Sequence, residues 1–452
     1  MRHAHVAVGA GTLRALLAEV AAEAPVRESV ARACSHLAAR SPQLLWLVVA
    51  VQPGSRALVI AAPAPGSRSR VSALAVHTGR VMDSDGETLA AMMDASGGAD
   101  LLVHHRWREL LGRDALSRRF YRELEQVVLE LAASAQGAAN DDTRREIALL
   151  YTSRLLFLSF LEAKGWLGGD REFLRRAFDE RCATGGEVHC RLLAPLFFGT
   201  LNTPWSRRAA AARSLGHITF LNGGLFARTT REKRARGLRF RDDAIGALIG
   251  GLLARYRVTA REDSSTWSEA AVDPEMLGRA FESLMASDDR RATGAFYTPP
   301  AIIERVASAG LEHALAARGA PNELVRASLG GTRLGARDRE RLGAALRDLC
   351  VLDPACGSGA FLVYLLERLA DLTGAAGDAR PVGVRRRDVL TQSIFGVDVN
   401  PTAVWLCELR LWLSVVIDSE ERDPLAVTPL PNLDRHVRVG DALGGPAFED
   451  AP

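Results

Sequence analysis

The chain has 452 residues, of which 48% are hydrophobic and 25% are charged, and its formal net charge at pH 7 is +3. This length suffices for two or three domains with cores of their own, and the composition is typical of a globular protein rather than a disordered, fibrous or membrane-spanning one. The net charge is too small to indicate a nucleic-acid partner by itself. The six cysteines show neither a Cys-x-x-Cys pair nor a zinc-site spacing, so we expect a reduced, cytoplasmic protein without a metal site. No apolar run approaches the length of a membrane span, so we expect none.

Residues 1–137 predict a small mixed α/β N-terminal domain. Apolar runs over 44–51 and 57–62, joined across a Pro-Gly-Ser turn at 53–55, predict a β-hairpin. Residues 71–76 predict a third strand, with helices before and after these strands. Nothing in this part of the sequence assigns the domain a function.

Two features that suggest a metal or nuclease site favour a structural interpretation. His104 and His105 are adjacent, so their side chains point apart on a helix or a strand. A nuclease site of the usual kind needs Asp/Glu-x-Lys on a strand, and no lysine precedes Lys164. Glu162 and Lys164 have this spacing, but they lie at the end of a predicted long helix. We therefore expect no nuclease here.

Residues 138–290 predict a helical connector. It follows an amphipathic helix that an apolar stripe predicts over residues 116–131. Within the connector, the acidic pair at 141–142 is expected to cap a helix that runs to Lys164 and stops at Gly165.

A basic, loop-like run at residues 228–241 is a candidate for contacts with nucleic-acid phosphates. The cations that carry this expectation are Arg231, Lys233, Arg234 and Arg236. A second basic stretch occupies residues 385–387. Charge runs more often form solvated surface, so this alternative stays open for both.

The stretch VLDPACGSGAFL at residues 351–362 predicts a buried strand that runs into a glycine-rich loop and then a helix. Asp353 stands at the carboxyl end of the strand. Gly357 and Gly359 remove side chains, so that a ligand can contact the backbone. The free N–H groups in the first turn of the helix would then face that ligand.

Other glycine-loop sites fit this stretch less well. In a dinucleotide fingerprint the third glycine would stand where Leu362 is, and the acid at the expected distance, Asp378, lies in a loop rather than at a strand end. No Gly-Lys-Ser/Thr follows, so it is not a Walker loop.

Two further short strands are predicted, and each ends in an acid. Residues 393–397 lead to Asp398, and residues 436–439 lead to Gly440 and Asp441. Ligands of open α/β sheets bind at the carboxyl ends of the strands. We therefore expect Asp353, Asp398 and Asp441 to converge on one crevice, in which Asp398 is placed to accept hydrogen bonds from a ribose diol.

Four segments resemble motifs X, I, II and III of S-adenosylmethionine-dependent adenine-N6 DNA methyltransferases. They are TGAFYTPPAI at 293–302, DPACGSGAFL at 353–362, GVDVNPTAV at 396–404 and GDAL at 440–443. Their order, with motif X first, is similar to that of the gamma group, especially the Eco57I-like enzymes of type IIG restriction-modification and related phage-defence methylases. Residues 220–226 and 273–277 also resemble the helical connector of that family. The resemblance implies that residues 291–452 form the first half of a Rossmann-like methyltransferase domain.

The resemblance also implies a role for each matching position. The residues that would bind S-adenosylmethionine are Tyr297, Thr298, Asp353, Ala355, Gly357, Gly359, Asp398 and Asp441. The first two would hold the methionine end, and the loop residues would line the methionine moiety. Asp398 would take the ribose hydroxyls, and Asp441 would accept from the adenine amino group.

The family's catalytic tetrapeptide, Asn/Asp-Pro-Pro-Tyr/Phe, does not occur in the sequence. In the family it contacts the flipped target base. We therefore expect the cofactor-binding front portion of a site-specific DNA adenine-N6 methyltransferase of a restriction-modification or phage-defence system. It would act on double-stranded DNA and be inactive without a C-terminal part or a partner chain that carries the tetrapeptide and target recognition.

Two alternatives stay open. The chain can be a non-catalytic S-adenosylmethionine-binding subunit or scaffold that needs a partner chain for catalysis. It can also belong to a methyltransferase that acts on RNA or protein, because enzymes with those substrates share the tetrapeptide.

Overall fold

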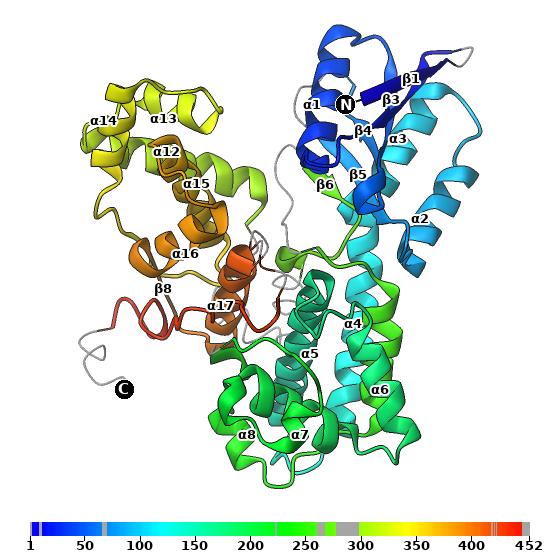
Figure 1. Ribbon diagram of the computed structural model, residues 1–452, viewed down its shortest axis with the longest axis vertical. Helices are drawn as coiled ribbons and strands as arrows, with labels where there is room; N and C mark the ends of the chain where they lie inside the picture. The colour runs from blue at the N-terminus through cyan, green and yellow to red at the C-terminus, as the bar shows by residue number, and fades with distance from the viewer. Residues whose placement is uncertain are drawn as a thin grey trace. The chain divides into compact units, whose positions relative to one another are not determined.

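The computed structural model shows a mixed α/β protein that is mostly helical and contains two β-sheets (Figure 1). The described residues are 2–8, 11–65, 70–221, 224–259, 267–276, 298–416, 419, 421 and 423–444. None of the helices in these ranges combines the length and the apolar character needed to cross a lipid bilayer. The α/β class that the sequence predicts is confirmed, whereas the assignment to a methyltransferase fold stays a prediction.

The chain folds as two compact units. They comprise Met1–Val127 with Ala247–Met276, and Val128–Gly246 with Leu277–Pro452. The first unit therefore draws on two separate stretches of the chain, and the helix α4 (Arg113–Ser134) runs from the first unit into the second. The expected domain bounds at residues 137 and 290 differ from these and stay a prediction.

The first unit is built on a six-stranded sheet in the order β1-β2-β3-β4-β5-β6. Its strands are β1 (Arg2–Val8), β2 (Leu13–Glu19), β3 (Leu45–Gln52), β4 (Ala57–Pro63), β5 (Val71–His77) and β6 (Trp267–Glu269). The pairs β2–β3 and β5–β6 are parallel, and the other pairs are antiparallel. The antiparallel run from β3 to β5 confirms the predicted hairpin and third strand.

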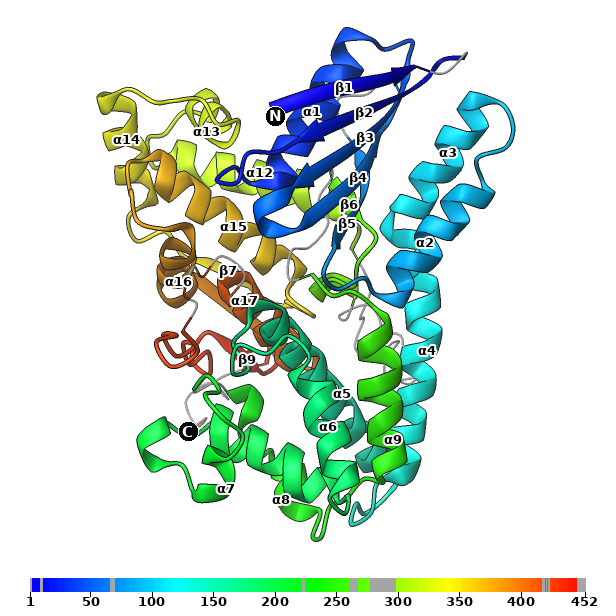
Figure 2. The same ribbon diagram turned by 45° about the vertical axis from the view of Figure 1, so that its right-hand side comes forward.

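Helices cover both faces of this sheet (Figures 1 and 2). α1 (Val26–Arg40) packs on one face, where its Val30 and Cys34 join a core with β3, β4 and β5. α2 (Asp83–Asp94) and α3 (Asp100–Leu111) lie on the other face. Cys34 is fully buried in this core, and burial raises the pKa of its thiol to about 12.

Three strands of the sheet are not predicted by the sequence. Arg14 and Glu19 interrupt the apolar run that becomes β2, and β1 pairs with that strand. β6 lies in the segment expected to be a helical connector, and it forms because Trp267–Glu269 pairs with the start of β5, with Ser268 beside Ser72. A π-helical segment, Ala247–Leu253, precedes it.

The first stretch of the second unit is helical. Its helices are α5 (Asp141–Lys164), α6 (Phe173–Ala183), α7 (Ala210–Arg213), α8 (Thr230–Arg234) and α9 (Asp242–Gly246), with short 3-10 or π segments at His189–Leu193, Pro195–Leu201, Trp205–Arg207 and Gly224–Phe226. α5 ends as predicted, with Gly165 at φ +79° as its C-cap. The predicted N-cap is wrong, because Asn140 accepts the hydrogen bond from the Thr143 N–H at 2.8 Å and the acidic pair lies in the first turn.

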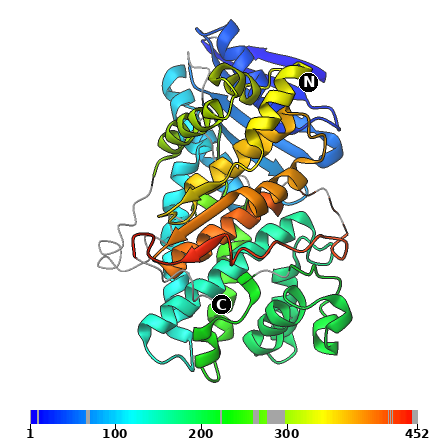
Figure 3. The same ribbon diagram turned by 90° about the vertical axis from the view of Figure 1, so that its left-hand side faces the viewer.

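The second sheet is parallel, in the order β7-β8-β9. Its strands are β7 (Val351–Asp353), β8 (Ile394–Asp398) and β9 (Val437–Val439). The helices around it, drawn from yellow to red in Figure 3, are α12 (Pro300–Ala317), α13 (Asn322–Leu329), α14 (Ala336–Leu346), α15 (Ala360–Ala375), α16 (Val382–Ser393) and α17 (Pro401–Val416). The three predicted strands are thus confirmed, and their carboxyl ends lie at the same edge. β7 is not buried as expected, because it is an outer strand of the described sheet and its Leu352 is 63% exposed.

Candidate cofactor site

The loop between β7 and α15 is fixed mainly by contacts with β8. The Cys356 N–H donates to the Val397 carbonyl at 2.9 Å, and the Gly357 N–H donates to Oδ2 of Asp398 at 2.8 Å. The Gly359 N–H closes a tight turn on the Cys356 carbonyl at 2.8 Å. The loop therefore has a defined shape before any ligand arrives.

The two glycines of the loop differ in what surrounds them. Both have positive φ, +53° at Gly357 and +84° at Gly359. A Cβ added at Gly359 would lie 2.5 Å from Sγ of Cys407, whereas one added at Gly357 would meet nothing within 4 Å. Gly359 is therefore required by packing on α17, and the space beside Gly357 is open to a ligand.

Asp398 connects three segments at the carboxyl ends of the strands. Besides the Gly357 N–H, its carboxylate accepts from the Asn400 N–H at 2.9 Å. Its backbone carbonyl accepts from the Gly440 N–H at 2.9 Å, at the end of β9. A carboxylate has about four acceptor positions. The half-buried Asp398 thus has capacity for further donors.

Asp353 lies close enough to Asp398 for the two charges to interact. Burial and the charge of Asp398 raise the pKa of the Asp353 carboxyl above its ordinary value, and the Ala355 N–H opposes this by donating to Oδ1 at 3.2 Å. Two neighbouring carboxylates in a partly buried site favour a cationic ligand group, since it relieves their repulsion.

Asp441 stands at the corresponding end of β9. It is exposed, and its Oδ1 accepts from the Leu443 N–H at 2.9 Å. The three acids therefore follow three adjacent strands, and Asp353 and Asp398 interact. A shared crevice that includes Asp441 stays a prediction.

The residues assigned to motif X are only partly described. Tyr297 lies outside the described residues, and Thr298 lies just before α12. α12 contacts α15 through the hydroxyls of Ser308 and Tyr364, which are 2.8 Å apart. The helix that begins at the glycine loop is therefore connected to the segment that follows Thr298.

Sequence reasoning missed the buried arginine that supports the loop from α17. Arg410 donates from Nη1 to the Ser358 carbonyl at 2.8 Å and to its hydroxyl at 3.2 Å. The signal available in the sequence is that Glu408 and Arg410 are charged residues in a mostly apolar helix. Nearby, a hydrogen bond with Cys356 and burial raise the pKa of Cys407 well above its usual range, so these thiols fill the core behind the loop.

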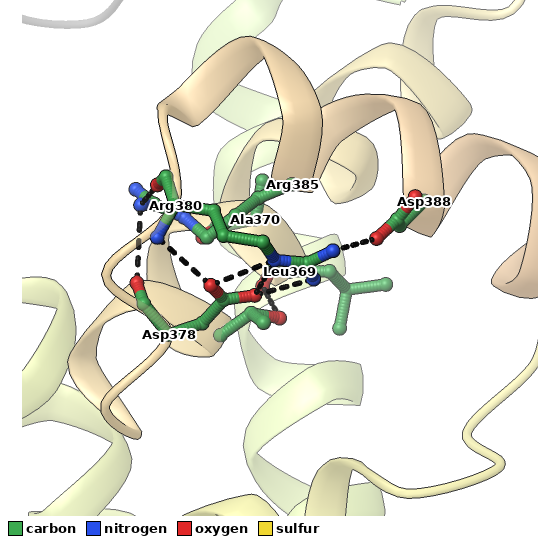
Figure 4. Close-up of polar contacts among 7 residues, drawn as sticks. Leu369, Ala370, Asp378, Arg380, Arg385 and Asp388 are labelled. Atoms are coloured by element: carbon green, nitrogen blue, oxygen red, sulfur yellow. Dashed lines mark hydrogen bonds and ion pairs between the residues drawn. The ribbon is translucent and has the colours of Figure 1, made fainter.

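Asp378, the acid at the distance expected for a dinucleotide site, lies in the turn between α15 and α16 and not at a strand end. Figure 4 shows its carboxylate bound by the Arg380 guanidinium, with Nη2 at 2.6 Å. Arg380 also pairs with Asp388 at 2.8 Å, and its hydrogen bond holds the pKa of Asp378 down at about 2. Arg385 donates to the Ala370 carbonyl at 3.1 Å beside them. Asp378 therefore shapes the turn between α15 and α16.

The two basic stretches differ in how far they serve the fold. The arginines at 385–387 lie on α16 and donate to backbone carbonyls of Ala370, Ser414 and Pro429. This use within the protein disfavours their assignment to phosphate.

The run at 228–241 is a loop as expected, except for the short helix α8 over Thr230–Arg234. Within it, Glu232 is buried against Arg154, and Arg231 pairs with Glu146. The other cations expected to contact phosphate, Lys233, Arg234 and Arg236, are exposed.

The two adjacent histidines lie in different surroundings. His104 is buried with Nε2 at 3.1 Å from the Trp46 carbonyl, while His105 is exposed and lies 3.7 Å from Glu109. In the described ranges, no group of three or more His, Cys, Asp or Glu residues is arranged to hold a metal ion.

Comparison with known proteins relates the chain to restriction-modification enzymes. No family model matches it. It is 28% identical over 332 residues to a putative type II restriction enzyme and methyltransferase of Methanocaldococcus jannaschii, a match that covers 67% of the chain and 28% of that protein. It is 36% identical over 98 residues to the adenine-specific methyltransferase PglX of Streptomyces coelicolor, covering 21% of the chain and 8% of that protein.

Two solved structures, both of complexes with DNA, are also similar. The type IIL restriction-modification enzyme MmeI aligns over 73% of the chain and 40% of its own, with 21% identity and a TM-score of 0.46. The DrdV–DNA complex aligns over 95% of the chain and 33% of its own, with 12% identity and a TM-score of 0.25. The sequence matches to the two curated relatives show a distant relationship to type II restriction-modification enzymes with a methyltransferase, and the chain spans less than a third of the length of either relative.

Proposed function

From this distant relationship we propose that the chain binds S-adenosylmethionine and is the cofactor-binding portion of a site-specific adenine-N6 DNA methyltransferase. The observation that carries the proposal is the loop after β7, whose Gly357 borders open space beside the interacting acids Asp353 and Asp398. The finer likeness to the Eco57I-like gamma group rests on the order of the four motifs in the sequence.

The charges of the site suit this cofactor. S-adenosylmethionine supplies a methyl group on a positively charged sulfonium, and its methionine end carries an ammonium. Burial, and secondarily the charge of Asp398, raise the pKa of Asp353, and a cation beside Asp353 would stabilise its ionised form against both. The first N–H groups of α15 have no partner within their own helix, and they favour the carboxylate of the methionine end.

The remaining contacts follow from the acceptors at the other two strand ends. Asp398 would receive the ribose hydroxyls on the acceptor positions that Gly357 and Asn400 leave free. Asp441, which is exposed one strand further along, would accept from the adenine amino group. Tyr297, Thr298 and Ala355 complete the proposed set by resemblance.

Methyl transfer itself is proposed for the protein completed by a C-terminal part or a partner chain. The Asn/Asp-Pro-Pro-Tyr/Phe tetrapeptide that contacts the target base is not in the sequence. The proposed substrate is double-stranded DNA, in a restriction-modification or phage-defence system. A non-catalytic S-adenosylmethionine-binding subunit or scaffold that needs a partner chain for catalysis is the second candidate. DNA methylation by the completed protein would decide for the enzyme.

The test is calorimetric titration of S-adenosylmethionine into the chain and into Asp398→Asn, with Asp338→Asn as control. Asp338 is an exposed acid on α14. Loss of hydrogen bonds to a charged acceptor should weaken binding by about 1.5–3 kcal/mol in Asp398→Asn and leave the control unchanged. No binding by the folded wild-type chain, or equal affinity in the Asp398 variant, would contradict the proposal.

A further inference from the structure

The first unit contains an open cavity of about 860 Å³ that is lined by four arginines. Arg70 comes just before β5, Arg106 and Arg108 lie on α3, and Arg118 lies on α4. The hydroxyl-bearing Ser72 and Ser268 face each other across the β5–β6 pair and also line it. Arginines from three separate segments therefore line one space.

The elements that carry these arginines are fixed to the unit. α3 is held to the sheet by the contact of His104 with the Trp46 carbonyl at 3.1 Å. It is held to α2 by Trp107, whose Nε1 donates to the Met92 carbonyl at 2.8 Å. The start of α4 is held by the Arg113 N–H, which donates to the Ser268 hydroxyl at 3.2 Å. The cavity is thus formed before a ligand binds.

Nearby acids offset the charge of these arginines only in part. Within the part of the chain that the structure describes, no ion pair involves Arg70, Arg106, Arg108 or Arg118. Burial and the neighbouring charge of Arg70 lower the pKa of Arg108, and Nε of Arg108 is buried without a hydrogen-bond partner. Like charges close together and an unpaired buried donor both favour an anionic ligand.

Acids in the same cavity limit what that anion can be. Asp94, Glu109 and Asp114 also line it, and Glu109 lies 3.7 Å from the ring of His105. The arginines exceed the acids by one charge. A phosphodiester carries one negative charge and matches this excess, whereas a nucleoside triphosphate would bring several charges near the acids. Arginine also pairs with phosphate through two parallel hydrogen bonds.

We propose that this arginine-lined cavity of the first unit binds backbone phosphodiesters of DNA. The inference rests on the proposed partner, double-stranded DNA, and not on cofactor binding. It assigns the first unit a part in DNA binding that no motif in residues 1–137 indicates.

The test is the salt dependence of binding to a fluorescent DNA duplex, measured with the full chain and with Arg106→Ala/Arg118→Ala. Both side chains are exposed, so the double variant should keep the wild-type melting temperature. The matched control is Arg32→Ala/Arg40→Ala, which removes two exposed arginines from α1 of the same unit. Each lost phosphate contact should reduce the slope of log K against log salt by roughly 0.9. We expect a reduction of roughly 1–2 in the cavity variant and none in the control.

An unchanged slope in the cavity variant, or an equal reduction in the control, would overturn the inference while leaving the DNA partner intact. A wild-type chain that binds no duplex at any salt concentration would overturn both. ATP as a second ligand separates the sources of phosphate. Binding of ATP to the wild-type chain but not to the cavity variant, together with the same salt slope for duplex binding in both proteins, would assign the cavity to a free nucleotide and overturn the proposed DNA contact.

Discussion

At the scale of single residues, two glycines of one loop have different roles: Gly359 is needed for folding, and Gly357 is proposed to border the ligand. Gly359 has no room for a Cβ because Cys407 lies against it, and Gly357 has open space. Both have positive φ, so an alanine at either position is strained. The difference between the two alanine variants therefore reports the clash at one position and the ligand space at the other.

We predict that Gly359→Ala lowers the free energy of unfolding by several kcal/mol, because backbone strain and overpacking against α17 add. Gly357→Ala should cost only about 1 kcal/mol of stability and should weaken S-adenosylmethionine binding more than it weakens the fold. Denaturant unfolding and calorimetry measure the two quantities. Equal destabilisation by both substitutions would show that the contact with Cys407 does not decide the first.

Glu408 of α17 gives a prediction for pH. Burial, and secondarily the charge of Asp434, raise the pKa of the Glu408 carboxyl to about 8. A carboxyl whose pKa is raised in the folded state contributes stability below its unfolded pKa near 4.5 and loses it as the pH rises through 8. The melting temperature of the wild-type chain should therefore fall relative to that of Glu408→Gln between about pH 5 and pH 8. A melting temperature that changes with pH by the same amount in both proteins over that range would contradict this.

At the scale of elements, the strands and helices with strong local signals are the ones that the sequence predicts. The β3–β4 hairpin has two apolar runs around a turn, and α5 has its glycine stop. The strands β7, β8 and β9 each lead into a glycine or an acid. These signals depend only on neighbouring residues, which is why a single sequence shows them.

The elements that the sequence does not predict depend on distant partners. β6 has only three residues and forms because β5, almost two hundred positions earlier, pairs with it. α8 looks like a solvated basic run until Glu232 is seen to be buried against Arg154 of α5. Arg410 of α17 likewise depends on a distant partner, because only folding brings it to Ser358 in the candidate site.

The Arg154–Glu232 pair gives the prediction for this scale. Both side chains are fully buried, 2.7 Å apart, and Arg154 also donates to the carbonyls of Leu225 and Ala227. Burial alone would raise the pKa of Glu232, but the charge and hydrogen bonds of Arg154 lower it below its ordinary value. The pair therefore stabilises the fold above the unfolded pKa of Glu232, and this contribution is lost as the pH falls through the folded pKa.

Arg154→Met should lower the free energy of unfolding by about 3–5 kcal/mol, because it leaves the buried carboxylate of Glu232 without a positive charge beside it. Arg144→Met, which breaks an exposed pair with Asp141, should change it by less than about 1 kcal/mol. Urea unfolding at neutral pH measures both. A loss in Arg154→Met no larger than in Arg144→Met would show that α8 does not depend on this pair.

At the scale of the whole molecule, the two units have separate proposed roles. The second unit carries the loop and the strand-end acids proposed for the cofactor, and the first unit carries the arginine-lined cavity proposed for DNA phosphates. Each role can fail alone, because the residues that carry one do not belong to the other unit.

The central claim is that S-adenosylmethionine binds at the carboxyl ends of β7, β8 and β9. Hydrogen–deuterium exchange of the chain with and without saturating S-adenosylmethionine tests it most directly, because the first unit serves as an internal reference. We expect slower exchange in peptides that cover residues 353–362, where the Gly357 N–H and the first turn of α15 lie, and in peptides that cover residues 396–400. We expect no change in peptides of the six-stranded sheet. Unchanged exchange in both of those segments, or protection confined to other parts of the chain, would contradict it.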